Sequence, residues 1–252
     1  MGESRDYNFD VNVYHNMTVE DCFFMESGIK TGQIPIILYK YRSTQRLLQF
    51  LHDGQLMFAT AEKFNDPYEC KQIIDTTIDE EQNECTHEPE QITKEDIEHV
   101  ISSCGIFCCT TRYNNIPMWA HYADNHTGCC LELDVRKDLD FFCYPNQVFY
   151  DKIYPSSKYF EDRIAHTKQM KKALSHKSSA WSYEREWRVI KLGFHGLHQL
   201  NPKALKSIIL GIENKTEKEI RDALSANTAW SHVKLKKAEP SKTNYEINLI
   251  EL

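Results

Sequence analysis

Hydrophobic and polar residues alternate along this chain in short stretches, which predict interleaved strands and helices. The β-branched and aromatic run from Ile36 to Arg42 is typical of a strand. Ser43 suits a helix cap, leucines recur on one helical face after it, and Gly54 suits a helix end. We therefore expect a first strand at 36–42, followed by a helix that runs through His52.

The rest of the chain continues in the same pattern. Short apolar runs predict further strands at 55–60, 105–111, 129–134, 147–153, 184–191, 207–211, 233–237 and 245–249. Capping residues predict helices at 93–103, 117–123 and 159–176, and another that begins at Thr216. Strand-turn-strand stretches outnumber βαβ units, which favours an α+β fold over a doubly wound sheet.

The organisation of the chain is predicted to be simple. No linker rich in Pro, Gly or Ser divides it, so we expect one domain over residues 1–252. Residues 1–30 predict an extended lead-in with one helical turn, and the acidic stretch 76–92 indicates an exposed insertion. Hydrophobic residues make up 41% of the chain and aromatic residues 12%, which is enough for a packed core and excludes a disordered protein.

Charge and cysteine content narrow the class of protein. The formal charge of −7 excludes the broad basic face of a duplex-binding protein but leaves room for a local basic groove. The nine cysteines are odd in number and form no CxxC, so we expect reduced, mostly buried thiols and no structural zinc. Because the sequence has neither a signal-peptide pattern nor an apolar run of about 18 residues, we expect a cytoplasmic protein without membrane contact.

The segment 118–128, MWAHYADNHTG, concentrates side chains that suit ligand binding. On a short helix, Trp119 and Tyr122 lie one turn apart on the same face. His121 and His126 are five residues apart, which does not suit joint metal binding on a helix. Two interpretations stay open. Either the aromatic residues belong to the core and the histidines bond to the backbone, or the segment contacts a ligand.

A second segment, WSYEREWRVIK at 181–191, places three charged side chains on one face of a predicted strand. Glu184, Glu186 and Arg188 alternate with Trp187 and Val189, which have the character of core residues. Two carboxylates beside a cation suit acid–base or charge-stabilising chemistry, because coupled carboxylates have perturbed pKa values. The alternative is an ion-paired stripe on the surface. The basic stretch 168–177 just before it is typical of a solvated helix face.

A third segment, FNDPYE at 64–69, has the composition of a turn, because Asn and Asp bond back to the backbone and Pro fixes φ. Asp66 and Glu69 either cap this turn or bind a metal. Phosphate-loop, dinucleotide-binding and GxSxG motifs are absent from the sequence.

Four stretches together resemble a bacterial and phage-borne family of unknown function, DUF2971. They are LYKYRS at 38–43, FNDPYE at 64–69, MWAHYADNHTG with the following CCLELD at 118–134, and WSYEREWRV at 181–189. Their order is also similar to that of the ADP-ribosyltransferase superfamily, in which the first strand ends with an aromatic residue and then Arg or His, and a later strand carries the catalytic Glu. Lys40 stands where that superfamily has Arg or His, and Arg42 follows on the same strand face.

The second resemblance implies an α+β domain with a mixed or antiparallel split sheet flanked by helices, and NAD as co-substrate. It implies that Glu186 stabilises the cationic ribose when the nicotinamide–ribose bond breaks, as in glycoside hydrolysis, and that Glu184 orients the acceptor. The aromatic members of the implied NAD site stack on nicotinamide and the cations pair with its diphosphate. That site consists of Lys40, Arg42, Phe107, Thr110, His121, Tyr122 and Arg188.

We therefore expect an enzyme that transfers ADP-ribose from NAD to a protein or nucleic-acid acceptor, as a toxin or a phage-defence effector does. Two alternatives stay open. A nucleic-acid-processing enzyme with a divalent metal would use Asp66, Glu69, His121 and His126. A non-catalytic binding module of a defence system would turn over no nucleotide.

Overall fold

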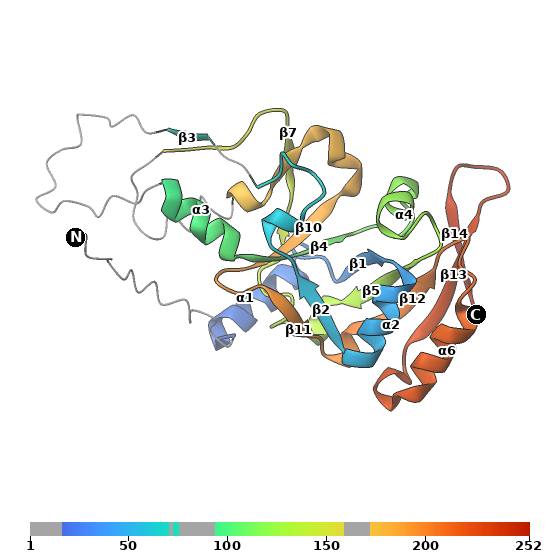
Figure 1. Cartoon of the computed structure of the whole chain (residues 1–252). Helices are drawn as coiled ribbons and strands as arrows, with labels where there is room; N and C mark the ends of the chain where they lie inside the picture. The colour runs from blue at the N-terminus through green and yellow to red at the C-terminus, as the bar shows by residue number, and fades with distance from the viewer. Residues whose placement is uncertain (1–16, 71–72, 76–93, 159–171) are drawn as a thin grey trace, which may run out of the picture.

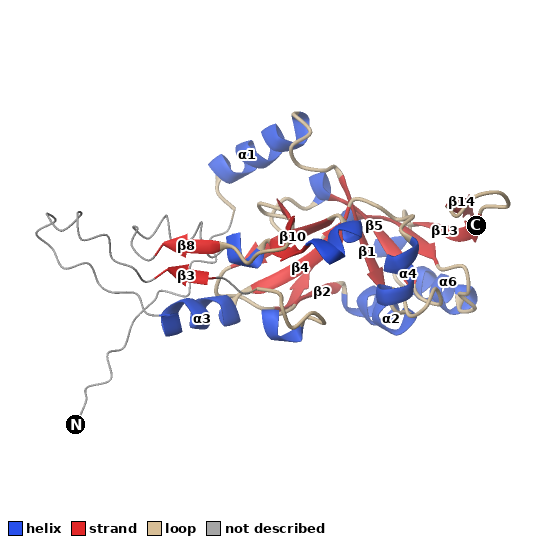
Figure 2. Cartoon of the chain, turned by 90° about the horizontal axis from the view of Figure 1, so that it is seen from above, coloured by secondary structure: helices blue, strands red, loops and turns tan. Residues whose placement is uncertain are grey.

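The computed structural model describes residues 17–70, 73–75, 94–158 and 172–252. Its largest element is a sheet of eight strands (Figure 1). These strands are β1 (Ile37–Arg42), β4 (Gly105–Thr110), β5 (Cys129–Asp134), β6 (Asn146–Gln147), β10 (Glu186–Lys191), β12 (Leu205–Leu210), β13 (Lys234–Pro240) and β14 (Ile247–Glu251). Their order across the sheet is β14-β13-β12-β5-β1-β4-β10-β6, so that β1 and β5 lie near its centre (Figure 2).

The sheet is mixed. The neighbours β12 and β13 are parallel, and the other pairs of the sheet are antiparallel. This confirms the predicted α+β class with a mixed sheet. The eight strands form one sheet and not the expected split one, although β1 and β4 are joined at a single registered pair, Tyr39 with Thr110. Beside that pair the Lys40 ammonium donates a hydrogen bond to the Cys108 carbonyl of β4 at 2.5 Å, a side-chain link between the same two strands.

Three smaller ladders accompany the main sheet. The antiparallel one joins β2 (Gln55–Phe58) to β11 (Gly196–Gln199). Two parallel ladders join β3 (Ile73–Asp75) to β8 (Ser156–Lys158) and β7 (Phe149–Asp151) to β9 (His176–Ser178). The predicted strand at 147–153 is therefore divided between β6 and β7, which belong to different ladders.

The described α-helices are α1 (Val19–Lys30), α2 (Thr44–Asp53), α3 (Lys94–Ser103), α4 (Ile116–Tyr122) and α6 (Glu217–Ala226). Side-chain caps mark the beginning of three of them, α1, α2 and α4. Ser43 caps α2 and Gly54 ends it in the left-handed region, as predicted. The expected extended lead-in at 1–30 is wrong for its second half, because Thr18 and Asp21 form a capping box that starts a twelve-residue helix.

Short 3-10 helices complete the described elements: η1 (Ala61–Lys63), η3 (Val135–Lys137), η4 (Ser179–Glu184), η5 (Pro202–Ala204) and η6 (Thr228–Trp230). The predicted acidic insertion at 76–92 lies outside the described residues, as do residues 159–171 of the predicted helix at 159–176. The eight described cysteines are free thiols. None of the described helices is long and apolar enough to cross a membrane.

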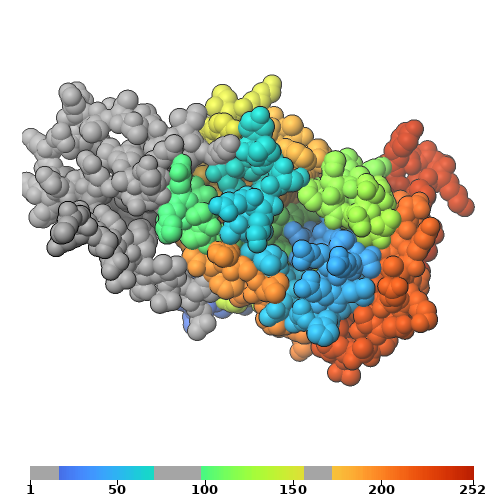
Figure 3. Space-filling view, viewed as in Figure 1, coloured from blue at the N-terminus to red at the C-terminus, as the bar shows by residue number. Residues whose placement is uncertain are grey.

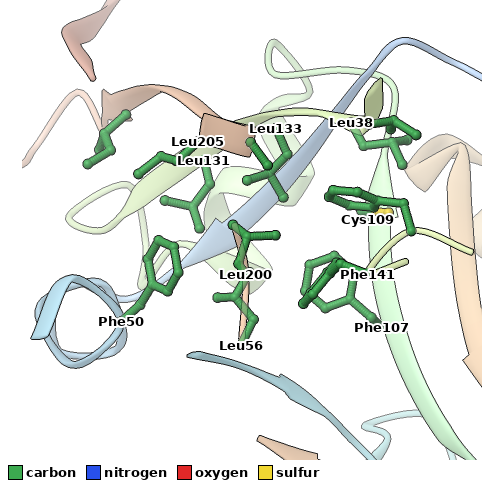
Figure 4. Close-up of a cluster of buried hydrophobic side chains, with 14 of the residues drawn as sticks. Leu38, Phe50, Leu56, Phe107, Cys109, Leu131, Leu133, Phe141, Leu200 and Leu205 are labelled. Atoms are coloured by element: carbon green, nitrogen blue, oxygen red, sulfur yellow. The ribbon is translucent and has the colours of Figure 1, made fainter. Parts of the chain in front are cut away.

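The two faces of the sheet carry different cores. One face carries the larger hydrophobic core, where α2 packs through Leu47, Phe50 and Leu51 (Figure 4). The other face packs against α4, whose Trp119 is fully buried and meets the ring of Tyr41 edge-on at 5.1 Å. Because side chains alternate along a strand, each polar residue of β1, β4 and β10 is assigned to one of these two faces by its register.

Candidate functional site

The three chemically distinctive segments of the sequence meet in space. Asn65 donates a hydrogen bond to the Tyr122 hydroxyl at 3.3 Å. That hydroxyl donates in turn to the Glu184 carboxylate at 2.7 Å. The loop after β2 and the region of α4 lie on the same face of the molecule, as Figure 3 shows in teal and light green. Segments more than 50 residues apart therefore converge on one point.

Beneath Tyr122 lies a group of five buried ionic side chains, which we call the buried charge cluster: Glu69, Lys177, Glu184, Glu186 and Arg188. Lys177 is its centre. The Lys177 ammonium lies 2.5 Å from Glu69 Oε1, 2.6 Å from Glu184 Oε2 and 3.4 Å from Glu186 Oε2. One cation thus holds all three carboxylates together.

Arg188 closes the cluster from the other side. Its Nε donates to Glu186 at 2.8 Å and one terminal nitrogen donates to Glu69 at 2.9 Å. The other terminal nitrogen donates to the Leu174 carbonyl at 2.6 Å, and the ring of Phe64 lies 5.1 Å from the guanidinium carbon. All three guanidinium nitrogens are therefore engaged inside the protein, which is the usual requirement for a fully buried arginine.

Glu184 and Glu186 come together through a kink and not through strand alternation. The prediction that a strand runs from 184 to 191 is wrong, because Glu184 ends η4 and β10 begins at Glu186. Between them Arg185 adopts the left-handed region with φ of 46°. Thr110 donates to the Glu184 carbonyl at 2.7 Å and so fixes the backbone at the kink. The two carboxylates are buried and do not lie in an open cleft.

The two carboxylates of the Arg185 kink differ in their affinity for protons. The pKa of Glu184 is raised, first by burial and further by the negative charge of Glu186, against the opposing effects of Lys177 and Tyr122. Burial opposes the ionised form of Glu186 as well, but Arg188 and Lys177 outweigh it and hold the pKa of Glu186 at about 2. The cluster has three carboxylates for two cations. Of Glu184 and Glu186, Glu184 is therefore the carboxylate that takes up a proton first.

Above the cluster lies a set of polar and aromatic side chains, which we call the polar-aromatic surface: Asn65, His121, Tyr122, Trp181 and Tyr183. The His121 ring lies 6.2 to 6.4 Å from the three aromatic rings. The Lys177 ammonium lies 5.0 Å from the Trp181 ring. His121 and Asn65 are exposed and the three aromatic residues are half-buried, so this surface connects the buried charge cluster with solvent.

Three residues of the implied NAD site lie away from the buried charge cluster. In the sheet, Tyr39, Thr110 and Glu186 are cross-strand partners and share a face, so Lys40 and Arg42 belong to the opposite face. Phe107 is fully buried in the larger core, where its ring meets those of aromatic core residues (Figure 4). In this conformation its ring is not available to stack on nicotinamide.

The residues of the metal hypothesis are engaged elsewhere. Asp66 accepts a hydrogen bond from the Tyr68 backbone amide, which is the turn-capping role, and Glu69 pairs with the cations of the buried charge cluster. His126 stacks beside Trp119, with ring centroids 6.4 Å apart. Within the described ranges, no three His, Cys, Asp or Glu side chains are placed to hold a metal ion.

Sequence reasoning missed two members of the cluster and one neighbour. Lys177 belonged to a basic stretch that predicts a solvated helix face, yet its side chain is buried in β9. Glu69 was expected in a turn or at a metal, and Asn65 was treated as a turn residue. One signal in the sequence could have indicated them. If the segment with Glu184 and Glu186 is buried, its carboxylates need buried cations as partners.

Comparison with known proteins supports one part of the expected resemblance. Residues 118–189 match the model of a family described as a protein of unknown function, DUF2971. The match runs from α4 to β10 and includes both Tyr122 and the Glu184–Arg188 segment. A search of curated proteins and a search of solved structures each gave no match.

Proposed function

We propose that this protein breaks the nicotinamide–ribose bond of NAD and transfers ADP-ribose to a protein or nucleic-acid acceptor. The observation that carries the proposal is the hydrogen bond from Tyr122 to Glu184, which connects a buried carboxylate pair with the polar-aromatic surface. On its resemblance to phage-borne proteins and to the ADP-ribosyltransferase superfamily, we assign the activity to a toxin or a phage-defence effector with an α+β fold of that kind.

The charge of the cluster suits a cationic transition state. When the bond breaks, nicotinamide leaves as a neutral molecule with the electron pair, and positive charge develops on the ribose. Because three carboxylates face two cations, the cluster has a negative charge in excess when all its groups are ionised. That charge stabilises the ribosyl cation from beneath the surface. Glu186 contributes as a positioning residue, since its oxygens are held by Arg188.

Glu184 is the group that handles the proton. An acceptor oxygen or nitrogen forms the new bond to the ribose carbon and must lose a proton. Tyr122 takes up that proton as it passes its own hydroxyl proton to Glu184 at 2.7 Å. The raised pKa of Glu184 makes it the stronger base of the pair. Half-buried Tyr122 lies between this carboxylate and the surface, so it is the group that touches the substrate.

The aromatic side chains suit the substrate as well. Trp181 and Tyr183 are half-buried and lie with ring centroids 6.0 Å apart, and exposed His121 lies beside both. Flat rings at the surface bind a flat ring such as nicotinamide by stacking. In this proposal they take the role first expected of Phe107, while Thr110 holds the Glu184 backbone.

The test uses NAD labelled in the nicotinamide ring, incubated with the protein and cell lysate. We expect nicotinamide release by the wild type and a loss of at least about 100-fold in Glu184→Gln, because general base catalysis contributes roughly that much. Tyr122→Phe should be impaired in the same direction. Glu219→Gln, at an exposed position of α6, is the matched control and should match the wild type.

Two results would overturn the proposal. One is a folded wild-type protein that releases no nicotinamide with or without lysate. The other is wild-type release by a folded Glu184→Gln variant. A second candidate function, a non-catalytic binding module, is favoured by one observation: all three carboxylates of the cluster are buried and ion-paired. That candidate predicts the first of these two results.

A further inference from the structure

We infer that Lys40, Arg42 and Arg46 form a binding site for the phosphate groups of a small molecule, on the sheet face opposite the buried charge cluster. We call these three residues the cation group. The inference goes beyond NAD cleavage and does not depend on it, because the cation group shares no residue with the cluster or with the polar-aromatic surface.

The fold brings the three cations to one place. Lys40 and Arg42 are two residues apart on β1 and therefore share a face. Arg46 follows in the first turn of α2, which begins directly after this strand. On the β4 side, the strand ends at Thr110, which pairs with Tyr39. Arg42 thus lies beyond the end of β4, and its only registered strand partner is Cys129 of β5.

The cation group lacks anionic partners. The Nε of Arg42 is buried and has no hydrogen-bond partner. Lys40 donates to the Cys108 carbonyl at 2.5 Å, and Arg46 donates to the Gln49 side chain at 3.5 Å. Across the part of the chain that the structure describes, none of the three forms an ion pair with a carboxylate. Desolvation of Lys40 and Arg42 without an anion is costly, and a ligand anion would offset that cost.

The environment of the group supports this assignment. Burial lowers the pKa of Arg42 to about 10, and the positive charge of Arg46 acts in the same direction. Burial also lowers the pKa of Lys40, with a further contribution from Arg42. Burial is the largest cause of both shifts, so each reflects a positive charge that is poorly solvated. A bound anion would reverse both.

The chemistry of the side chains selects phosphate over other anions. A guanidinium offers a planar fork of donors that matches two phosphate oxygens, and a lysine adds a point charge. The positive end of the α2 dipole lies beside Arg42 and favours the same charge. Three cations within one short stretch of β1 and α2, with Arg42 between the other two, suit a compact, multiply charged group. A nucleic-acid backbone needs basic residues spread along many phosphates, and this chain has a net charge of −7.

The test is calorimetric titration of inorganic pyrophosphate into the wild type, Arg42→Gln, Arg46→Gln and Arg221→Gln, with chloride matched for ionic strength. Arg221 is the matched control, because it lies on the surface of α6 and already pairs with Glu217. We expect saturable binding to the wild type, weakened about tenfold in Arg42→Gln and less in Arg46→Gln, and unchanged in Arg221→Gln. Thermal unfolding verifies that each variant is folded. If Arg42→Gln does not fold, the Arg46→Gln variant decides the test, because Arg46 is exposed.

Several outcomes would overturn the inference: no saturable binding at millimolar pyrophosphate, equal affinity of a folded Arg42→Gln variant, or equal weakening in Arg221→Gln. Binding of a single-stranded oligonucleotide without binding of pyrophosphate would do so as well. Glu184→Gln separates this site from NAD cleavage. It is expected to lose nicotinamide release and to bind pyrophosphate like the wild type.

Discussion

The buried charge cluster and the cation group lie on opposite faces of the same sheet, and each contains an arginine from a strand of that sheet. Arg188 of β10 contacts two carboxylates and a carbonyl, so its charge is fully matched inside the protein. Arg42 of β1 has a buried Nε without any partner. The same side chain is thus part of the internal structure at one site and incompletely bonded at the other.

The number of internal partners separates a structural charge from a charge that is available to a ligand. A cluster whose cations are all paired holds its own geometry and sets the proton affinities of its carboxylates, as it does for Glu184 and Glu186. A group of cations that has no anionic partner among the described residues is free to take one from a ligand. Burial alone does not distinguish the two, because it affects both; the number of internal partners does.

The largest effect is expected for Arg188→Met. The substitution leaves Glu69 and Glu186 buried without this cation, and breaking a buried ion pair from one side costs about 3–5 kcal/mol. Urea unfolding measures the free energy of unfolding, with Arg221→Met as a control that stays within about 0.5 kcal/mol. A decrease of less than about 1 kcal/mol in the free energy of unfolding would show that Arg188 is not needed to stabilise the carboxylates of the cluster.

The pH dependence of stability comes next. Because the folded-state pKa of Glu186 is depressed from 4.5 to about 2, its contribution is present above pH 4.5 and is lost as the pH falls toward 2. A shift of this size corresponds to up to roughly 3 kcal/mol. Glu184 has the opposite sign, since its raised pKa makes stability fall as the pH rises above 4.5.

Unfolding measured from pH 2 to 8 in the wild type and in both Gln variants separates these two contributions. Glu186→Gln should flatten the curve below pH 4.5, and Glu184→Gln should flatten it above. If Glu186→Gln flattened the stability curve above pH 4.5 and Glu184→Gln flattened it below, the assignment of the two carboxylates would be reversed.

Tyr122→Phe should have a smaller effect on stability. It removes the hydrogen bond to Glu184 but leaves the ring in place, and a hydrogen bond to a charged group contributes about 1.5–3 kcal/mol. Since Tyr122 is half-buried and water can replace the hydroxyl, we expect a cost of about 1 kcal/mol by urea unfolding. A cost as large as that of Arg188→Met would make Tyr122 a structural member of the cluster.

The smallest effect is expected for Arg42→Met, which is the direct counterpart of Arg188→Met. No carboxylate in the described part of the chain loses a partner, so stability should change by less than about 0.5 kcal/mol or rise slightly. The same urea titration measures both variants. If Arg42→Met were as damaging as Arg188→Met, Arg42 would be a structural residue and the comparison between the two sites would fail.

The parts of the fold that sequence reasoning predicted are those set by local signals. Ser43 and Gly54 bound α2 by the hydrogen bonds and backbone angles that their residue types favour, and β1 follows a β-branched and aromatic run. The helix α1 was missed because its apolar residues do not keep one face. Phe23 and Val19 are exposed, and only its cap marks where it begins.

The candidate site was predicted in part for the same reason. Tyr122 and Glu184 were picked out by unusual local composition, but Glu69 meets Arg188 across 119 residues of chain, which no local signal encodes. Strand alternation failed at Arg185, since a non-glycine residue in the left-handed region is not visible in the sequence. Alternation correctly placed Lys40 with Arg42. Their position opposite Glu186 depends on the register of β1, β4 and β10.

The opposite proton affinities of Glu184 and Glu186 are the feature on which the proposed chemistry depends most. They are measured directly by a pH titration of the glutamate carboxyl NMR signals in 13C-labelled protein. The Glu184→Gln and Glu186→Gln variants assign the two signals, because each variant lacks one of them. We predict that Glu184 titrates above the ordinary glutamate value of 4.5 and that Glu186 stays ionised down to about pH 2. Titration of Glu184 at or below the pKa of Glu186 would contradict its role as the base.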